Sequence, residues 1–212
     1  MKVLTGVGIA LLACSFGASS LSARQNAPQG PPPGQFPTPT TLSAALDFQL
    51  TIEEREVTAA ADAMPEDKYS FAPTNGEFKG VRTFAQQVKH IATVNNRFFG
   101  AILGQPPATP GSQFEAENGP DSVQTKAQIL QYLHDSFALG HKAIATITAD
   151  NAFVPMKTTP TPFLKTPGSI VIFDLGHTPD HYGQMVEYLR DNGIVPPASR
   201  QRPPANPAPA SK

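Results

Sequence analysis

The chain has 212 residues, with 16 Lys and Arg against 17 Asp and Glu, and a formal net charge of −1. This length suits one domain better than two. Because the charges are nearly balanced and no basic cluster is present, the composition argues against a nucleic acid as a partner. The sequence contains 23 prolines and a single cysteine.

The first 23 residues have the pattern of a secretory signal peptide. An apolar run over 3–16 is too short to span a bilayer, and small residues follow it up to Ala23. Cleavage near Ala23 would remove the only cysteine, Cys14, and with it disulfides, a thiolate nucleophile and cysteine metal ligands. We expect a secreted or periplasmic protein with no integral membrane span in its mature form. Lipid attachment at Cys14, within the sequence LLAC, is the alternative.

Two proline-rich segments flank the central part of the chain. Residues 24–41 and 196–212 contain six prolines each. Such segments bury too little apolar surface to offset the entropy of ordering, so we predict a linker over 24–41 and a disordered tail over 196–212. The domain is then expected over 42–195.

Four long stretches within this domain have helical character, and no strand-like alternation of any length is present. The first helix is predicted over 42–64 and stops at Pro65, and the second over 80–103. The third is expected to begin with Asp121 or Ser122 as its cap, and the fourth runs from about Ser169 to Asn192. Gly193 is a suitable residue to end it. The chain is therefore predicted to be an all-α protein, a four-helix bundle joined by polar loops over 65–79, 104–121 and 151–168.

The histidines are the candidate functional residues. His177 and His181 are four residues apart, which places them on one face of a helix with Cβ atoms about 5–6 Å apart. Two imidazoles at this spacing can bind one ion, and a third ligand has to come from another helix, where His90 is available. Three neutral imidazoles and an open position are typical of a catalytic metal site, in which the ion acts as a Lewis acid.

The pattern also supports other interpretations. His90 lies off the apolar stripe of its helix, so periodicity alone predicts that it is exposed. His134 and His141 lie on the apolar stripe of the third helix. They are expected to be core histidines, groups that support the metal ligands, or alternative ligands. Pro179 either bends the fourth helix or begins it after a Thr178 cap, and in that case His177 would fall outside the helix.

Three stretches resemble one known family. They are HTPDHYGQMVEYLRDNGIVPPAS (177–199), AMPEDKYSFAPT (63–74) and FAQQVKHIATVNN (84–96). Together they are similar, over about 42–199, to the DinB/YfiT-like superfamily of metal-dependent four-helix-bundle proteins. The resemblance implies a divalent transition metal, most often zinc or nickel, held by His90, His177 and His181. Characterised relatives include S-transferases and isomerases that use low-molecular-weight thiols.

These observations support more than one function. The first is a metal-dependent enzyme, a hydrolase or a thiol/S-transferase, acting on a small molecule; a secreted protein would, however, be separated from the cytosolic thiol pool. Asp174 and Asp180 are the acidic groups nearest the histidine pair, but the sequence assigns no catalytic residue. The alternatives are a non-catalytic metal-binding or structural module of the cell envelope, and a bundle without metal. A homodimer is compatible with the 13 phenylalanines.

Overall fold

The computed structural model describes residues 38–106 and 116–200. Within these ranges the chain forms four long helices and three short 3-10 turns, without strands. The helices are α1 (Leu42–Ala63), α2 (Phe84–Ile102), α3 (Lys126–Ile144) and α4 (Pro167–Asp191). The turns are η1 (Glu66–Lys68), η2 (Ala116–Asn118) and η3 (Pro197–Ser199). The predicted all-α four-helix bundle is confirmed.

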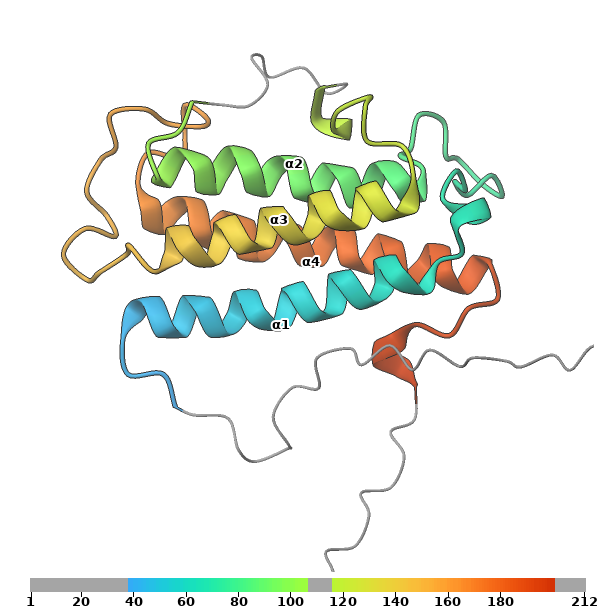
Figure 1. Cartoon of the computed structure of the whole chain (residues 1–212), viewed down its shortest axis with the longest axis horizontal. Coiled ribbons are helices and arrows are strands. Elements are labelled where there is room, and N and C mark those ends of the chain that lie inside the picture. Colours follow the sequence, from blue (N-terminus) through green and yellow to red (C-terminus); the bar gives the residue numbers. More distant parts are fainter. Residues whose placement is uncertain (1–37, 107–115, 201–212) are drawn as a thin grey trace, which may run out of the picture. The chain divides into compact units, whose positions relative to one another are not determined.

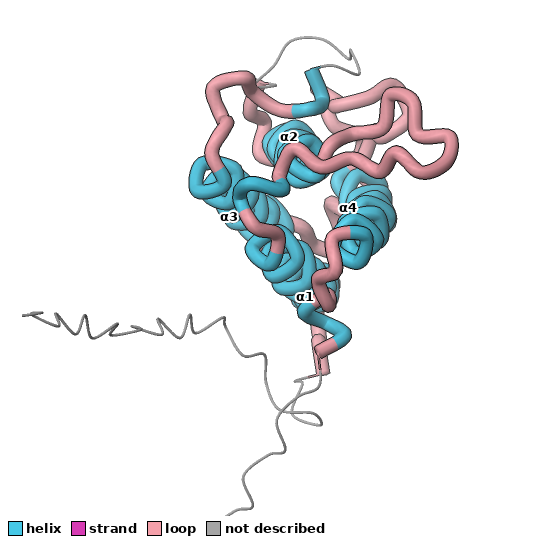
Figure 2. The backbone as a smooth tube through the Cα atoms, turned by 90° about the vertical axis from the view of Figure 1, so that its right-hand side faces the viewer, coloured by secondary structure: helices cyan, strands magenta, loops and turns pink. Residues whose placement is uncertain are grey.

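The helices form a closed ring around one core. α1 packs against α3 and α4, and α2 packs against the same two helices, so α1 and α2 lie opposite each other in the end-on view (Figure 2). α1 and α4 run in one direction, and α2 and α3 run in the other (Figure 1). Because α2 and α3 are parallel neighbours, the chain has to return along the bundle between them. The turn η2 belongs to this connection and contacts α2.

Each helix begins after a threonine that caps it. The caps are Thr41, Thr83, Thr125 and Thr166, and the hydroxyl of each accepts a backbone N–H of the first turn. At the last three a reciprocal side-chain bond completes a capping box. The predicted starts of two helices are therefore wrong by a few residues. α3 begins at Lys126 rather than at a cap formed by Asp121 or Ser122, and α2 begins at Phe84 rather than near 80.

The fourth helix continues through Pro179 and ends at a glycine. Pro179 lies inside α4, so the helix does not begin there and His177 is helical. Gly193 adopts a φ of 72°. Its N–H donates to the Arg190 carbonyl, and the Ile194 N–H donates to the Leu189 carbonyl. This pair of bonds is the Schellman arrangement, which confirms Gly193 as the residue that ends the helix.

The core contains many of the phenylalanines. Phe84, Phe99 and Phe137 are fully buried, and Phe98 is 2% exposed. Rings of this size each remove a large apolar area from water and dominate the energetics of packing. Four described phenylalanines are exposed instead: Phe78 (40%), Phe153 (67%), Phe163 (68%) and Phe173 (39%).

Parts of the predicted flanking segments lie outside the described residues. The expected signal peptide (1–23), most of the linker and the segment after Arg200 are among them. Of the described residues in these two segments, Thr41 caps α1, and the turn η3 contacts α1. Among the described helices, none combines the length and the apolar character that crossing a membrane requires.

Candidate metal centre

Three histidines from two helices meet at one point. α2 carries His90, and α4 carries His177 and His181 on one face. The Nε2 atom of His177 lies 3.2 Å from Nε2 of His90 and 3.1 Å from Nε2 of His181. One ring nitrogen from each of the three lies within 4.8 Å of the others. Because α2 and α4 pack side by side, the i,i+4 pair and the third histidine reach each other directly.

The far nitrogens of two of these rings are held by hydrogen-bond acceptors. Nδ1–H of His90 donates to the Glu117 carbonyl at 2.9 Å, and Nδ1–H of His181 donates to Oε1 of Gln87 at 2.8 Å. Gln184 orients Gln87 in turn, because Nε2 of Gln87 donates to Oε1 of Gln184 at 2.7 Å. With the protons on Nδ1, the lone pairs of both Nε2 atoms point into the cluster.

His90 is buried by a segment from the connection after α2, which helical periodicity cannot predict. His90 is only 4% exposed, so the prediction from its helical-wheel position was wrong. The turn η2 and the residues after it cover this polar face of α2: the Glu117 carbonyl accepts from His90 at 2.9 Å, and Lys89 donates to the Pro120 carbonyl at 2.7 Å. Because a loop buries this polar face, no apolar stripe in the sequence marks it. Only the family resemblance identified His90 as a candidate ligand.

Burial keeps the three imidazoles neutral. It lowers the pKa of His90 to about 4, assisted by the positive charge of Arg82. It lowers the pKa of His181 to about 3, where the neighbouring histidines add to the effect. The pKa of His177 is also lowered by burial, although Asp180 and Glu117 oppose the shift. Neutral imidazoles are the form that binds a metal.

The geometry fits a metal ion. Nitrogens about 2.0–2.1 Å from one ion lie about 2.9–3.4 Å apart for angles between perpendicular and tetrahedral. The two Nε2–Nε2 separations, 3.1 and 3.2 Å, fall in this range. Without an ion, two lone pairs that face each other repel, and a single ring proton can relieve only one contact. The buried Nδ1 of His177 has no hydrogen-bond partner among the described residues. The cluster could therefore hold a divalent transition ion.

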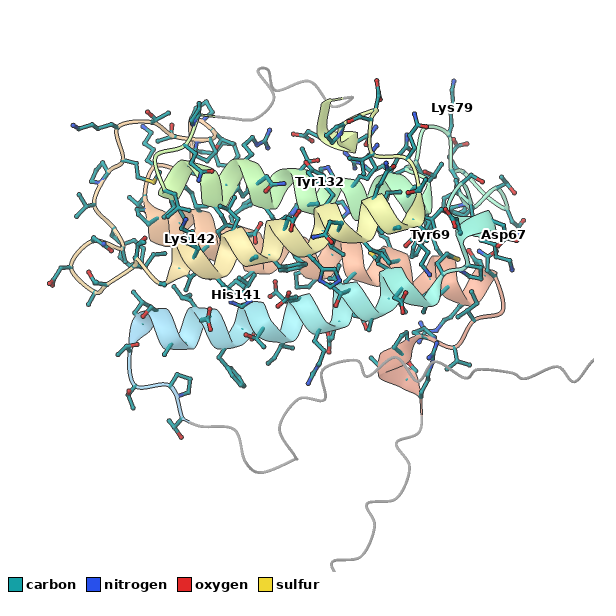
Figure 3. All side chains as sticks on the ribbon, viewed as in Figure 1. Asp67, Tyr69, Lys79, Tyr132, His141 and Lys142 are labelled. Carbon is teal, nitrogen blue, oxygen red and sulfur yellow. The ribbon has the colours of Figure 1, made fainter. Side chains whose placement is uncertain are left out.

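The two remaining histidines lie elsewhere. His134 is exposed on α3. His141 lies between α3 and α1 (Figure 3), with Nδ1 2.6 Å from Asp47 and Nε2 3.1 Å from Glu54. Neither belongs to the cluster. Of the interpretations left open by the sequence, His141 fits that of a histidine bonded to side chains within the bundle.

The acidic neighbours of the pair have different surroundings. Asp174 is fully buried, and its carboxylate interacts electrostatically with Glu53 of α1. Asp180 is exposed and accepts a hydrogen bond from Gln184 at 3.1 Å. Through Gln184 and Gln87, Asp180 stands at the end of a chain of hydrogen bonds that leads to His181. This chain orients a ring, and sequence reasoning missed both glutamines.

Fold and site together define a four-helix bundle with a three-histidine cluster between its second and fourth helices. The profile of the DinB superfamily matches residues 49–185. The chain belongs to the DinB superfamily, as the resemblance of the three sequence stretches predicted.

Solved structures show the same fold. An uncharacterised Escherichia coli protein superimposes with a TM-score of 0.57 at 16% identity, over 74% of this chain and 98% of its own. A DinB-like protein from Bacillus subtilis superimposes with a TM-score of 0.53 at 17% identity, over 74% and 99% of the two chains. Among curated proteins, none matches the sequence significantly.

Proposed function

We propose that His90, His177 and His181 bind a divalent transition ion, zinc or nickel, and that the protein is an enzyme of the hydrolase or thiol/S-transferase type. The observation that carries this proposal is the convergence of three Nε2 atoms whose rings are neutral and, in two cases, anchored through Nδ1. A divalent ion held by three imidazoles supplies Lewis acidity, which activates water or a substrate oxygen or sulfur.

The residues around the cluster support this role. The Glu117 carbonyl and Gln87 keep two rings in the tautomer that presents Nε2. Arg97 forms an ion pair with Glu117 at 3.2 Å, which holds η2 against α2. This part of the chain thus orients the ligands before any ion binds, and preorganised ligands lose less entropy on binding.

The setting of the protein is part of the proposal. We place it in the periplasm or outside the cell, on the basis of the leader pattern over 1–23, with a small molecule as its substrate. The balanced charge argues against nucleic acid as a partner. A homodimer is compatible with the exposed phenylalanines.

Metal content tests the site directly. Untagged protein, incubated with zinc or nickel and then desalted, is analysed by plasma mass spectrometry. We expect about one ion per chain, lost in His90→Ala, His177→Ala and His181→Ala. The exposed His134→Ala variant is the matched control and should retain the ion. An unaltered metal content in all three cluster variants would rule out the proposed site.

A substrate screen then separates an enzyme from a binding module. The metal-loaded protein is tested with esters, amides and thiol-conjugation substrates. Turnover that disappears in His177→Ala and persists in His134→Ala supports the enzyme. If one ion is bound and every substrate class is left intact, the chain is a non-catalytic metal-binding protein.

A further inference from the structure

Three phenylalanines lie together beside the metal cluster, with Phe173 as the central ring. The ring of Phe173 stacks on His177, with centroids 5.7 Å apart and an interplanar angle of 20°. Phe98 meets Phe173 edge-on at 5.6 Å, and Phe163 meets it at 6.2 Å. We call Phe98, Phe163 and Phe173 the aromatic shelf. It becomes more exposed with distance from the core: Phe98 is 2% exposed, Phe173 39% and Phe163 68%.

The outer end of the shelf is held in place by its neighbours. Leu164, the residue after Phe163, is buried with Ile170 and Phe98 in a small apolar cluster. Its N–H donates to the Thr161 hydroxyl at 3.1 Å. The Phe163 ring itself buries little surface, so the folded chain gains little from its apolar character. A large exposed apolar ring in an anchored loop beside a candidate site points to a ligand contact.

The shelf flanks the more accessible side of the cluster. His90 and His181 are buried, whereas His177 is half-buried. Phe173 stacks on His177 rather than on either buried ring. A molecule that reaches the cluster past His177 therefore passes along Phe173, and any group attached to it extends toward Phe163.

A divalent ion bound at the cluster would favour an anionic head group. Arg82 and Arg97 lie close enough to lower the pKa of His90 and of His177. Both pair with the single carboxylate of Glu117, at 3.9 and 3.2 Å. At His177, Asp180 and Glu117 oppose these two arginines, so the charges of the protein itself nearly balance and a bound divalent ion would supply the positive charge.

We infer that the substrate carries an apolar, ring-sized group next to an anionic head, and that Phe163 and Phe173 bind this group while the head meets the ion. The inference rests on the proposed metal site. Burial of part of a phenyl ring against two others should improve affinity about tenfold.

Two hydroxamates test the inference. Acetohydroxamate and phenylpropanohydroxamate share an alkyl hydroxamate head and differ by a phenyl ring on a short chain. Their Kd values are measured by calorimetry on the zinc-loaded protein. We expect the phenyl compound to bind about tenfold more tightly. Phe163→Ala should reduce this preference at least about threefold and leave the Kd of acetohydroxamate unchanged.

Phe153→Ala is the matched control, because Phe153 is 67% exposed and lies beside Gly168 at the start of α4 rather than on the shelf. It should preserve the preference. Equal affinity for the two probes in the natural protein would contradict the proposed role of the aromatic shelf, but it would not contradict the proposed metal site. A chain that binds neither zinc nor acetohydroxamate would instead overturn the proposed function. A dimer that dissociates in Phe163→Ala would show that a second copy covers the shelf, and would also overturn the inference.

Discussion

His141 forms a charged contact between α3 and α1. The sequence pattern had placed this residue on the apolar stripe of its helix. Hydrogen bonding to Glu54 is the largest effect, with Asp47 adding to it, and together they raise the pKa of His141 to about 9 against the opposing effect of burial. A histidine whose pKa is higher in the folded than in the unfolded state stabilises the fold fully below the unfolded value of about 6.5. That contribution is lost as the pH rises through about 9.

His141→Gln should therefore destabilise the protein in a pH-dependent way. At pH 6 we expect a loss of about 1 kcal/mol in the free energy of unfolding, since the pairs are partly exposed. The loss should shrink between pH 6.5 and 10 as the natural histidine gives up its proton. Urea titrations of metal-free protein across this range measure it, with the exposed His134→Gln as control. A loss that is constant with pH would mean that His141 is not charged at pH 6.

At the scale of single helices, glycines in α3 and α4 serve different purposes. A Cβ at Gly140 of α3 would lie 2.9 Å from Cδ2 of Leu50 and 2.9 Å from Cε2 of Phe99. Both neighbours are fully buried and belong to α1 and α2. Gly140 thus allows three helices to approach closely. Gly183 of α4 is exposed, and a Cβ there would meet nothing within 4 Å.

The same substitution should have opposite effects at these two glycines. Gly183→Ala should raise the free energy of unfolding by about 0.5–1 kcal/mol, because alanine loses less backbone entropy in a helix. Gly140→Ala should lower it by about 1–3 kcal/mol, because overpacking exceeds that gain. Chemical denaturation of both metal-free variants provides the test. A stabilised Gly140→Ala would show that the helices can separate at little cost.

Pro179 shows that the bundle tolerates a local conflict within α4. It removes one backbone N–H donor inside the helix, and such a proline costs about 3 kcal/mol. The helix nevertheless continues, because residues on both sides of the proline are buried: Asp174 and Thr178 before it, His181 and Met185 after it. Tertiary packing thus keeps both histidines of the pair on one helical face.

At the scale of the whole molecule, the bundle buries two carboxyl groups from different helices. Burial raises the pKa of Asp174 to about 8, and Glu53 contributes; burial also raises the pKa of Glu53 to about 7. Neither oxygen of Asp174 has a hydrogen-bond partner among the described residues. Because the folded state keeps a proton that the unfolded chain releases near pH 4, stability falls as the pH rises from about 4 to about 8.

Asp174→Asn should remove this part of the pH dependence. We expect the variant to exceed the natural protein in unfolding free energy by about 1–3 kcal/mol at pH 8, and by less at pH 5. Thermal or urea unfolding of metal-free protein at both pH values measures the difference. If the difference is the same at pH 5 and pH 8, Asp174 does not carry a raised pKa.

Much of the fold could be predicted from the sequence, because helix formation depends on neighbouring residues. The apolar spacing of α2, the stop at Pro65 and the glycine after α4 all act within a few residues of the chain. The exact starts of α2 and α3 could not be predicted as well, since several polar residues compete as caps. The reciprocal bonds between Thr125 and Gln128, which form only in the folded turn, decide that α3 begins at Lys126.

The candidate site was predictable only in part. The i,i+4 spacing of His177 and His181 is a property of one helix, and the sequence contains it. His90 lies 87 residues before His177, and periodicity predicted the wrong environment for it. The family resemblance named it correctly as a neighbour of the pair, but without a physical reason.

The tertiary structure supplies that reason. The sequence alone established four helices, their approximate bounds and a balanced charge, because these follow from local propensity and composition. The direction and order of the helices around the ring, the covering of α2 by η2, the anchoring of His181 by Gln87 and the row of rings from His177 to Phe163 depend on contacts between distant residues. Helical periodicity describes only the apolar surface of one helix, whereas this site is built from polar groups that three separate segments bring together.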